Sequence, residues 1–208
     1  MFKLLNARVG TETERMKYFS SFISNYDHTS LLDLGCGKGL LFDSIPTSNE
    51  AALVGVDLIK SRKKNYNHVV ASATTLPFRD GAFSLVTAFS LIEHIPESER
   101  SMFCKEAKRV LKPKGTFVLQ LPNRYFIIES HSYLPFFGFL PSRMHSFAYR
   151  GGYTAVPSLK KAMKFLKESG LDIFKVQKYE GTFLPFGEFL SKIGLFHLSP
   201  MGYVVSAR

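Results

Sequence analysis

The sequence predicts a doubly wound α/β domain, in which a mostly parallel sheet carries helices on both faces. Short apolar segments with strand character alternate with segments of helical period along the 208 residues. Glycine and proline mark the turns between them, without internal repeats or low-complexity linkers. A chain of this length, 45% hydrophobic and 21% charged, suffices for one packed core, so we expect residues 1–208 to form a single domain.

Strand and helix signals alternate through the first half of the chain. Apolar runs bounded by turn residues predict strands, and the segments between them have helical periodicity. In chain order we expect a helix over 11–25, a strand over 30–34, a short helix from residue 38, and strands over 52–57, near 67–71 and near 83–89. Ligands of such a fold bind beyond the carboxyl ends of the strands.

The second half continues the alternation. We expect a helix near 96–111, a strand over 116–121, an amphipathic helix over 157–169, and strands near 171–179 and 202–207. Pro113 and Gly115 in "KPKG" end the first of these helices, and Gly170 closes the second. These strands would complete the sheet.

The first predicted strand runs directly into a glycine-rich turn, "LLDLGCGKG" at residues 31–39. Glycine lets a ligand approach the backbone closely, and the N-terminus of a following helix offers unpaired N–H groups. A dinucleotide fingerprint needs G-x-G-x-x-G, but the third glycine comes one residue early, at Gly39, and Leu40 stands at the fingerprint position. No G-x-x-x-x-G-K-[ST] loop occurs in the chain. The turn therefore indicates a ligand site and argues against a nicotinamide dinucleotide.

A carboxylate ends the second predicted strand. Asp57 in "ALVGVD" lies about twenty residues beyond the glycine turn, where an acid binds the two free hydroxyls of a ribose. A lone acid at a strand end is more often a cap or turn residue. Its combination with the glycine turn favours the ligand role, so we expect a ribose-containing ligand.

Five segments in order carry a family resemblance: "LLDLGCGKG", "VGVD", "ATTLPFRDGAFSLV", "FSLIEHI" and "AKRVLKPKGTFVLQLPN". They resemble the motifs of class I S-adenosylmethionine-dependent methyltransferases, especially the branch with the quinone-biosynthesis enzymes. The resemblance implies a Rossmann-like seven-stranded sheet that binds S-adenosylmethionine and releases S-adenosylhomocysteine. It places Asp57 at the ribose, Leu58 at the adenine, and Phe89 and Ser90 beside the sulfonium. Around the methionine part it places Asp33, Gly35, Cys36, Gly37 and Gly39.

The position after the third strand departs from that family's pattern. Family members usually carry an acid there that accepts a hydrogen bond from the adenine amine, whereas "VVASATTLPF" has Ser72. We expect Ser72, or the backbone near Ala73 and Thr74, to take over this contact. A hydroxyl forms a weaker hydrogen bond than a carboxylate, so cofactor affinity is expected to be modest.

Direct methyl transfer from a charged sulfur depends mainly on alignment of donor and acceptor. A hydroxyl acceptor also benefits from a base, and His94 in "LIEHIP" is the candidate; the alternative is that His94 only caps or packs the next helix. Amino-directed enzymes of this fold often carry an N-P-P-Y type tetrad where this chain has "FSLIEH". Methylation of nucleobase amines is therefore disfavoured.

Residues 123–155 form an insertion with nine Phe and Tyr residues. A loop so rich in aromatics packs as a cap over the site or contacts a partner. We expect an aromatic-rich substrate lid within the single domain; the alternative is a local minicore. Its candidate polar contacts to substrate are His131, Arg143, His145 and Tyr149.

The net charge of +10 is concentrated in one part of the chain. Residues 105–178 contain 14 Lys/Arg and 4 Asp/Glu, whereas the rest contains 13 of each. The excess favours an anionic membrane, a nucleic acid or a phosphorylated substrate as partner, or is only a solvated basic face. Cys36 and Cys104 are too few for a disulfide framework or a zinc site, and we expect no metal. Without a long apolar run or a secretory h-region, the expected location is cytoplasmic.

Three functions are consistent with these observations. The one we favour is an S-adenosylmethionine-dependent methyltransferase that O- or C-methylates a small, apolar or lipid-like acceptor. An RNA or protein methyltransferase is favoured only by the basic residues, and nucleic acid is the less favoured partner. A non-catalytic S-adenosylmethionine-binding regulatory protein is permitted by Ser72.

Overall fold

The computed structural model describes residues 12–45, 51–61, 65–125, 156–179, 189, 192–194 and 202–208. These residues contain a seven-stranded sheet with the strand order β3-β2-β1-β4-β5-β7-β6. In chain order the helices and strands are α2 (Glu12–Ile23), β1 (Ser30–Leu34), β2 (Ala52–Asp57), β3 (Asn67–Val70), β4 (Phe83–Phe89), η1 (Ile92–His94), η2 (Glu97–Glu99), α3 (Arg100–Val110), β5 (Leu111–Pro122), α5 (Leu159–Glu168), β6 (Ile173–Tyr179) and β7 (Gly202–Ala207). The predicted doubly wound, Rossmann-like seven-stranded sheet is confirmed.

The sheet is parallel except at β7. β1 pairs in parallel with β2 and β4, and the parallel pairing continues to β3 and β5. β7 runs antiparallel to both β5 and β6. β1 and β4 are buried along their whole length, which explains why both are nearly continuous apolar runs in the sequence. The carboxyl ends of β1, β2 and β4 consequently meet at one edge of the sheet.

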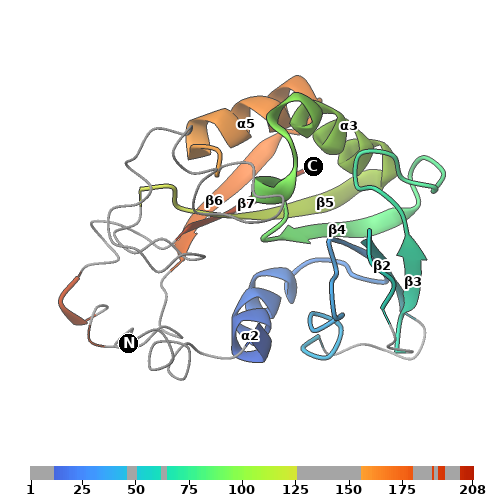
Figure 1. Ribbon diagram of the computed structural model, residues 1–208, viewed down its shortest axis with the longest axis horizontal. Coiled ribbons are helices and arrows are strands. Elements are labelled where there is room, and N and C mark those ends of the chain that lie inside the picture. Colours follow the sequence, from blue (N-terminus) through green and yellow to red (C-terminus); the bar gives the residue numbers. More distant parts are fainter. Residues whose placement is uncertain are drawn as a thin grey trace.

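Helices cover both faces of the sheet (Figure 1). α3 and α5 pack together on one face, and α2 lies on the other. Phe103 of α3 and Leu166 of α5 belong to the first core, and Phe19 and Ile23 of α2 to the second. The ring of Phe19 stacks on Phe89 with centroids 5.1 Å apart, which brings α2 beside the carboxyl end of β4.

The predicted helix from residue 38 is wrong within the described segment. Residues 37–44 form successive turns instead, and 46–50 lie outside the described residues. Gly37 and Gly39 have φ angles of +50° and +69°. Left-handed backbone at two nearby positions is incompatible with the negative φ of an α-helix, so the helix cannot begin where the glycine pattern suggested.

The strand after α3 begins five residues earlier than the sequence indicated. β5 starts at Leu111, which pairs with Phe83, and the register then shifts before Leu85 pairs with Thr116. The residues that follow Leu111 up to Lys114 are exposed, and Lys114 has a φ of +65°. "KPKG" therefore ends the helix, as predicted, and also forms an irregular stretch within the strand.

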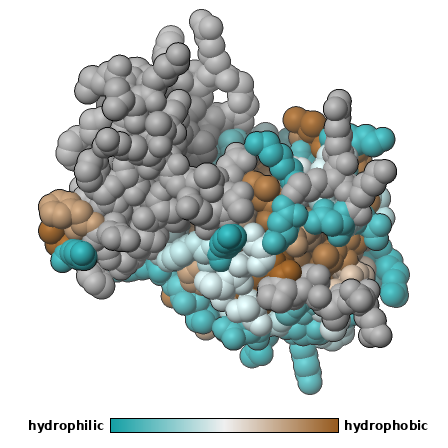
Figure 2. Space-filling view, turned by 90° about the horizontal axis from the view of Figure 1, so that it is seen from below, coloured by the Kyte–Doolittle hydropathy of each residue, from teal (hydrophilic) through white to brown (hydrophobic). Residues whose placement is uncertain are grey.

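Most of the predicted lid, 126–155, lies outside the described residues. Its four candidate contacts, His131, Arg143, His145 and Tyr149, lie there too. Among the residues described, no helix is both long and apolar enough to span a membrane. On the face shown in Figure 2, hydrophobic residues of the described part of the chain lie among hydrophilic ones.

Candidate functional site

Two adjoining cavities lie where β1, β2 and β4 end. The larger has a volume of about 360 Å³ and the smaller of about 250 Å³, and Gly35 and Ser90 line both. Predicted site residues on the larger cavity are Asp57, Leu58, Ser72, Ala73 and His94. Those on the smaller cavity are Asp33, Cys36, Gly37 and Phe89. The fold thus brings together nearly all the predicted site residues that lie in the described part of the chain.

The glycine turn is fastened to the end of the neighbouring strand. The N–H groups of Gly35 and Cys36 donate to the Val56 carbonyl at 2.8 and 3.1 Å. A Cβ on Gly35 would lie 2.8 Å from the Leu91 side chain, whereas Gly37 has nothing within 4 Å of such an atom. The turn therefore needs glycine at Gly35 for close packing, and it leaves open space at Gly37.

Gly39 lines neither cavity. A Cβ there would collide with the ring of Tyr66, so glycine at this position serves packing of the turn. The thiol of Cys36 lies 3.9 Å from the Tyr66 hydroxyl, and burial raises the pKa of Cys36 to about 12. Burial does the same for Cys104, which packs in the α3 core. With a raised pKa, both thiols stay protonated and are poor nucleophiles at neutral pH. In the described residues, no group of His, Cys, Asp and Glu could hold a metal ion.

Asp57 connects β2 to the glycine turn. Its Oδ2 accepts a hydrogen bond from the Gly37 N–H at 2.8 Å, and its Oδ1 accepts one from the Ile59 N–H at 3.0 Å. Each carboxylate oxygen has a further lone pair. The side chain therefore fixes the turn and still offers two acceptors to the larger cavity that it lines.

Asp33 is a buried acid on the smaller cavity. Burial raises the pKa of its carboxyl to about 7, the hydrogen bond from Thr87 Oγ1 at 2.7 Å opposes this, and the charge of Asp57 adds to it. Asp33 consequently exchanges a proton near neutral pH. A cation in the smaller cavity would stabilise its charged form.

Ser72 is engaged within its own turn. Its hydroxyl oxygen accepts the Thr74 N–H at 3.2 Å and shares a hydrogen bond with the Thr74 hydroxyl at 2.8 Å. Such a short serine turn orders the local backbone. The Ser72 side chain therefore helps to shape the wall of the larger cavity.

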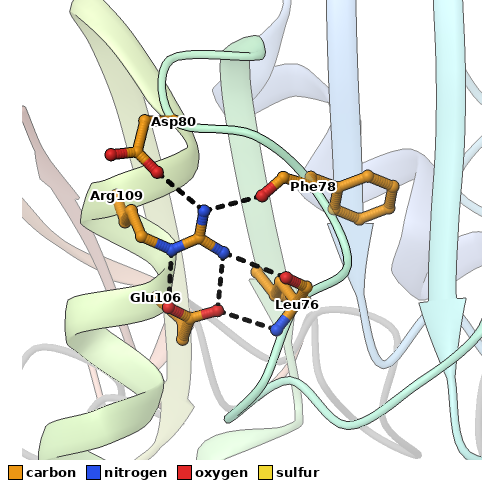
Figure 3. Close-up of polar contacts among 5 residues, drawn as sticks. All are labelled: Leu76, Phe78, Asp80, Glu106 and Arg109. Atoms are coloured by element: carbon orange, nitrogen blue, oxygen red, sulfur yellow. Dashed lines mark hydrogen bonds and ion pairs between the residues drawn. The ribbon is translucent and has the colours of Figure 1, made fainter.

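Arg109 of α3 holds the chain that follows this turn (Figure 3). Its guanidinium donates to the carbonyls of Leu76 and Phe78 at 3.0 and 2.6 Å, and it pairs with Asp80 and Glu106. Glu106 also accepts the Leu76 N–H at 2.7 Å, and the hydrogen bond from Arg109 lowers the pKa of Glu106. This network anchors the segment that directly follows the cavity-lining residues 71–74 to a packed helix.

A chain of hydrogen bonds supports Ser90, where the two cavities meet. Ser90 has a φ of +51°, and both its N–H and its hydroxyl donate to Gln120 Oε1, at 2.7 and 3.0 Å. The Gln120 amide in turn donates to the Tyr179 hydroxyl at 2.9 Å. A left-handed non-glycine residue needs such support, and residues of this kind occur often at functional sites.

Three charged residues on the cavity walls were not predicted as site residues from the sequence. Arg15 and Lys38 line the smaller cavity, and Glu99 lines the larger. Arg15 Nε is buried without a hydrogen-bond partner among the described residues. Lys38 lies within the glycine motif and could have been named from it. Arg15 and Glu99 reach the site from α2 and η2 through tertiary packing, for which the sequence offers no local signal.

His94 lies on the larger cavity, at the end of η1, and its side chain is exposed. It shares this cavity with Asp57 and Ser72, whereas Phe89 and Asp33 line the smaller one. The catalytic role of His94 stays a prediction.

The sheet order, the glycine turn and the acid at the end of β2 define a Rossmann-like cofactor-binding domain. Residues 32–119 match the family model described as a methyltransferase domain. This match supports the resemblance of the chain to the class I S-adenosylmethionine-dependent methyltransferases.

Individual relatives are similar at a moderate level. The 27-O-demethylrifamycin SV methyltransferase of Amycolatopsis mediterranei is 28% identical over 68% of this chain and 53% of its own length. A ubiquinone biosynthesis O-methyltransferase of Coxiella burnetii is 27% identical over 64% of this chain and 62% of its own length. The chain thus spans little more than half of these relatives. A methyltransferase structure from Mesorhizobium loti has the same fold, with a TM-score of 0.66, 15% identity, and coverage of 94% of this chain and 99% of that one.

Proposed function

We propose that the protein transfers a methyl group from S-adenosylmethionine to a small, apolar or lipid-like acceptor, at oxygen or carbon. The observation that carries the proposal is the pair of adjoining cavities, with Asp57 on one, Asp33 on the other, and Gly35 and Ser90 between them. This arrangement fits a ligand with a neutral ribose part and a charged amino-acid part.

The larger cavity would hold the adenosine part. Asp57 keeps two acceptor positions for the ribose hydroxyls, and the exposed Leu58 would cover the adenine together with Ala73. Leu58 is 73% exposed, and such an apolar side chain gains by contact with a flat base. NAD is disfavoured because the glycine pattern departs from its fingerprint.

The smaller cavity would hold the methionine part. Its ammonium suits Asp33, and its carboxylate suits Arg15, whose buried Nε has no partner among the described residues, and Lys38. The sulfonium would then lie where the cavities meet, near Gly35, Phe89 and Ser90. Cys36 and Gly37 would line the methionine chain, while Gly39 supports the turn from behind.

Catalysis would rest on alignment of the acceptor with the methyl group. When bound, S-adenosylmethionine supplies a methyl group on a positively charged sulfur. The protein's own part is to orient the acceptor, to exclude water, and, for a hydroxyl acceptor, to remove its proton. His94 is the proposed base, and its exposure leaves it accessible to an acceptor that enters from solvent.

Aromatic residues near the smaller cavity support an apolar acceptor. Phe89 on the cavity wall stacks on Phe19, which also meets Tyr179 edge to face at 5.3 Å. Two relatives named above are methyltransferases, and one is by name an O-methyltransferase of ubiquinone biosynthesis. The proposed lid, 123–155, would close over this end, with His131, Arg143, His145 and Tyr149 in contact with the acceptor.

The basic residues support an anionic surface as a peripheral partner. α5 buries Ala162 and Leu166 and exposes Lys160, Lys164 and Lys167 along one side. Such a stripe would be attracted to an anionic membrane where a lipid-like acceptor resides. RNA or protein methylation is the second candidate, favoured by the same charge.

Transfer of tritiated methyl groups into fractionated lysate tests the proposed reaction. Label in the lipid or small-molecule fraction supports it, and label in RNA or protein replaces it with the second candidate. Binding of S-adenosylmethionine without transfer to any fraction would favour the non-catalytic regulatory role.

A further inference from the structure

Among the described residues, Ser72 stands where family members carry the acid that accepts a hydrogen bond from the adenine amine. This point rests on the proposed function, in which the larger cavity holds adenosine. The Ser72 hydroxyl there is neutral and already bonded to Thr74 through two of its hydrogen-bonding positions. Asp57, a carboxylate of the same cavity, lies at the end of β2, where its two remaining acceptor positions are assigned to the ribose hydroxyls in the proposed function. A charged acceptor for the amine must therefore come from another part of the wall.

Glu99 is the second carboxylate on the larger cavity. It lies at the end of η2 and immediately before α3, and it lines the same cavity as the Ser72–Thr74 turn. It occupies the N-cap position of α3, yet its side chain makes no cap hydrogen bond. The neighbouring Glu97 differs, because it pairs with Lys161 of α5 and does not line the cavity.

The backbone that carries Glu99 is firmly held. Arg100 is only 2% exposed, and its Nε donates to the Ile95 carbonyl at 3.0 Å. Ile95 and Pro96 also line the cavity, so this bond fixes the wall next to Glu99. A carboxylate on a fixed backbone can recognise a ligand group at low entropic cost.

We infer that Glu99 accepts a hydrogen bond from the exocyclic amine of adenine and makes the site selective for adenine over hypoxanthine. Glu99 takes over the role of the acid that Ser72 replaces, from another part of the chain that lines the cavity. Hypoxanthine presents a carbonyl oxygen at the position of the amine, and this oxygen would face the Glu99 carboxylate. The wild-type site thus rejects the hypoxanthine base by charge and lone-pair repulsion.

The test compares S-adenosylhomocysteine with S-inosylhomocysteine, which differ at the base alone. Calorimetric titration of wild type, Glu99→Gln and Glu99→Ala should give falling affinity for S-adenosylhomocysteine in that order, with a loss of about tenfold or more for the alanine variant. Affinity for S-inosylhomocysteine should stay constant or rise, above all in Glu99→Gln, whose amide can donate to the hypoxanthine oxygen. Ser72→Asp combined with Glu99→Ala should restore binding of S-adenosylhomocysteine.

Glu97→Gln is the matched control, since it removes an equal charge two residues away. It should leave the affinities for both ligands unchanged. Equal loss of both ligands in the Glu99 variants would show that Glu99 only stabilises the start of α3, and unchanged affinities would remove it from the site. Either result overturns the inference. Failure of wild type to bind S-adenosylhomocysteine would instead overturn the proposed function.

Discussion

Replacement of Asp57 by alanine should weaken cofactor binding far more than it weakens the fold. Hydrogen bonds to a charged group contribute about 1.5–3 kcal/mol. Loss of that contribution lowers affinity by about 10- to 150-fold, at 1.4 kcal/mol for each factor of ten. The two hydrogen bonds that Asp57 accepts, from the N–H groups of Gly37 and Ile59, are exposed to solvent, so water can replace the carboxylate as acceptor in the alanine variant. Asp57→Asn retains one good acceptor and should fall between wild type and alanine.

Calorimetric titration with S-adenosylhomocysteine measures this loss, and thermal unfolding of the same samples measures the fold. Asp172→Ala is the control, since Asp172 is an exposed acid that lines neither cavity. We expect its affinity to equal that of wild type. Unchanged affinity in Asp57→Ala, with an intact melting transition, would refute the placement of the ribose at the end of β2.

Further predictions concern the other parts of the site, the proposed lid and the basic surface. Arg15→Gln should weaken binding of S-adenosylhomocysteine by about tenfold but not that of methylthioadenosine, which has no carboxylate; parallel titrations decide whether Arg15 holds that group. Burial raises the pKa of Asp33 to about 7, so part of the protein carries a protonated Asp33 at pH 7. The ammonium group of the ligand favours the charged carboxylate, and cofactor binding at pH 7 should therefore release a proton from Asp33. The observed binding enthalpy should therefore vary with the ionisation enthalpy of the buffer, and Asp33→Asn should abolish this variation. In the absence of cofactor, the raised pKa of Asp33 means that its contribution to stability is fully present below about pH 4 and is lost as the pH rises through about 7. The melting temperature of the wild type should therefore fall over this pH range relative to that of Asp33→Asn. No such fall would contradict the raised pKa of Asp33. Deletion of 132–148 should abolish methyl transfer and leave cofactor affinity unchanged if these residues belong to the lid, and co-sedimentation of the full chain with anionic liposomes should weaken as salt rises.

The central strands could be predicted closely from sequence. The segments 30–34, 52–57 and 83–89 coincide with β1, β2 and β4, since buried parallel strands are apolar runs bounded by turns. The helix predicted from residue 38 failed because glycine φ angles, which sequence alone does not report, decide whether a helix can begin. β5 began earlier than predicted because a register shift against β4 extends the pairing to Leu111.

In the candidate site, too, some residues could be predicted from the sequence and others could not. Asp33 lies near the carboxyl end of β1, Asp57 ends β2 and Ser72 comes two residues after β3, so their meeting at one edge of a parallel sheet could be predicted. Arg15 and Glu99 stand on α2 and at the start of α3, and their place on the cavity walls depends on how these helices pack. Local pattern does not encode that packing, because it is set by contacts between residues distant in sequence.

Cofactor binding tests the account most directly. Titration of the wild-type chain with S-adenosylmethionine, S-adenosylhomocysteine and NAD under identical conditions should show saturable one-to-one binding of the first two and none of NAD. Saturable binding of NAD, or no binding of either S-adenosyl compound, would contradict the assignment of the paired cavities.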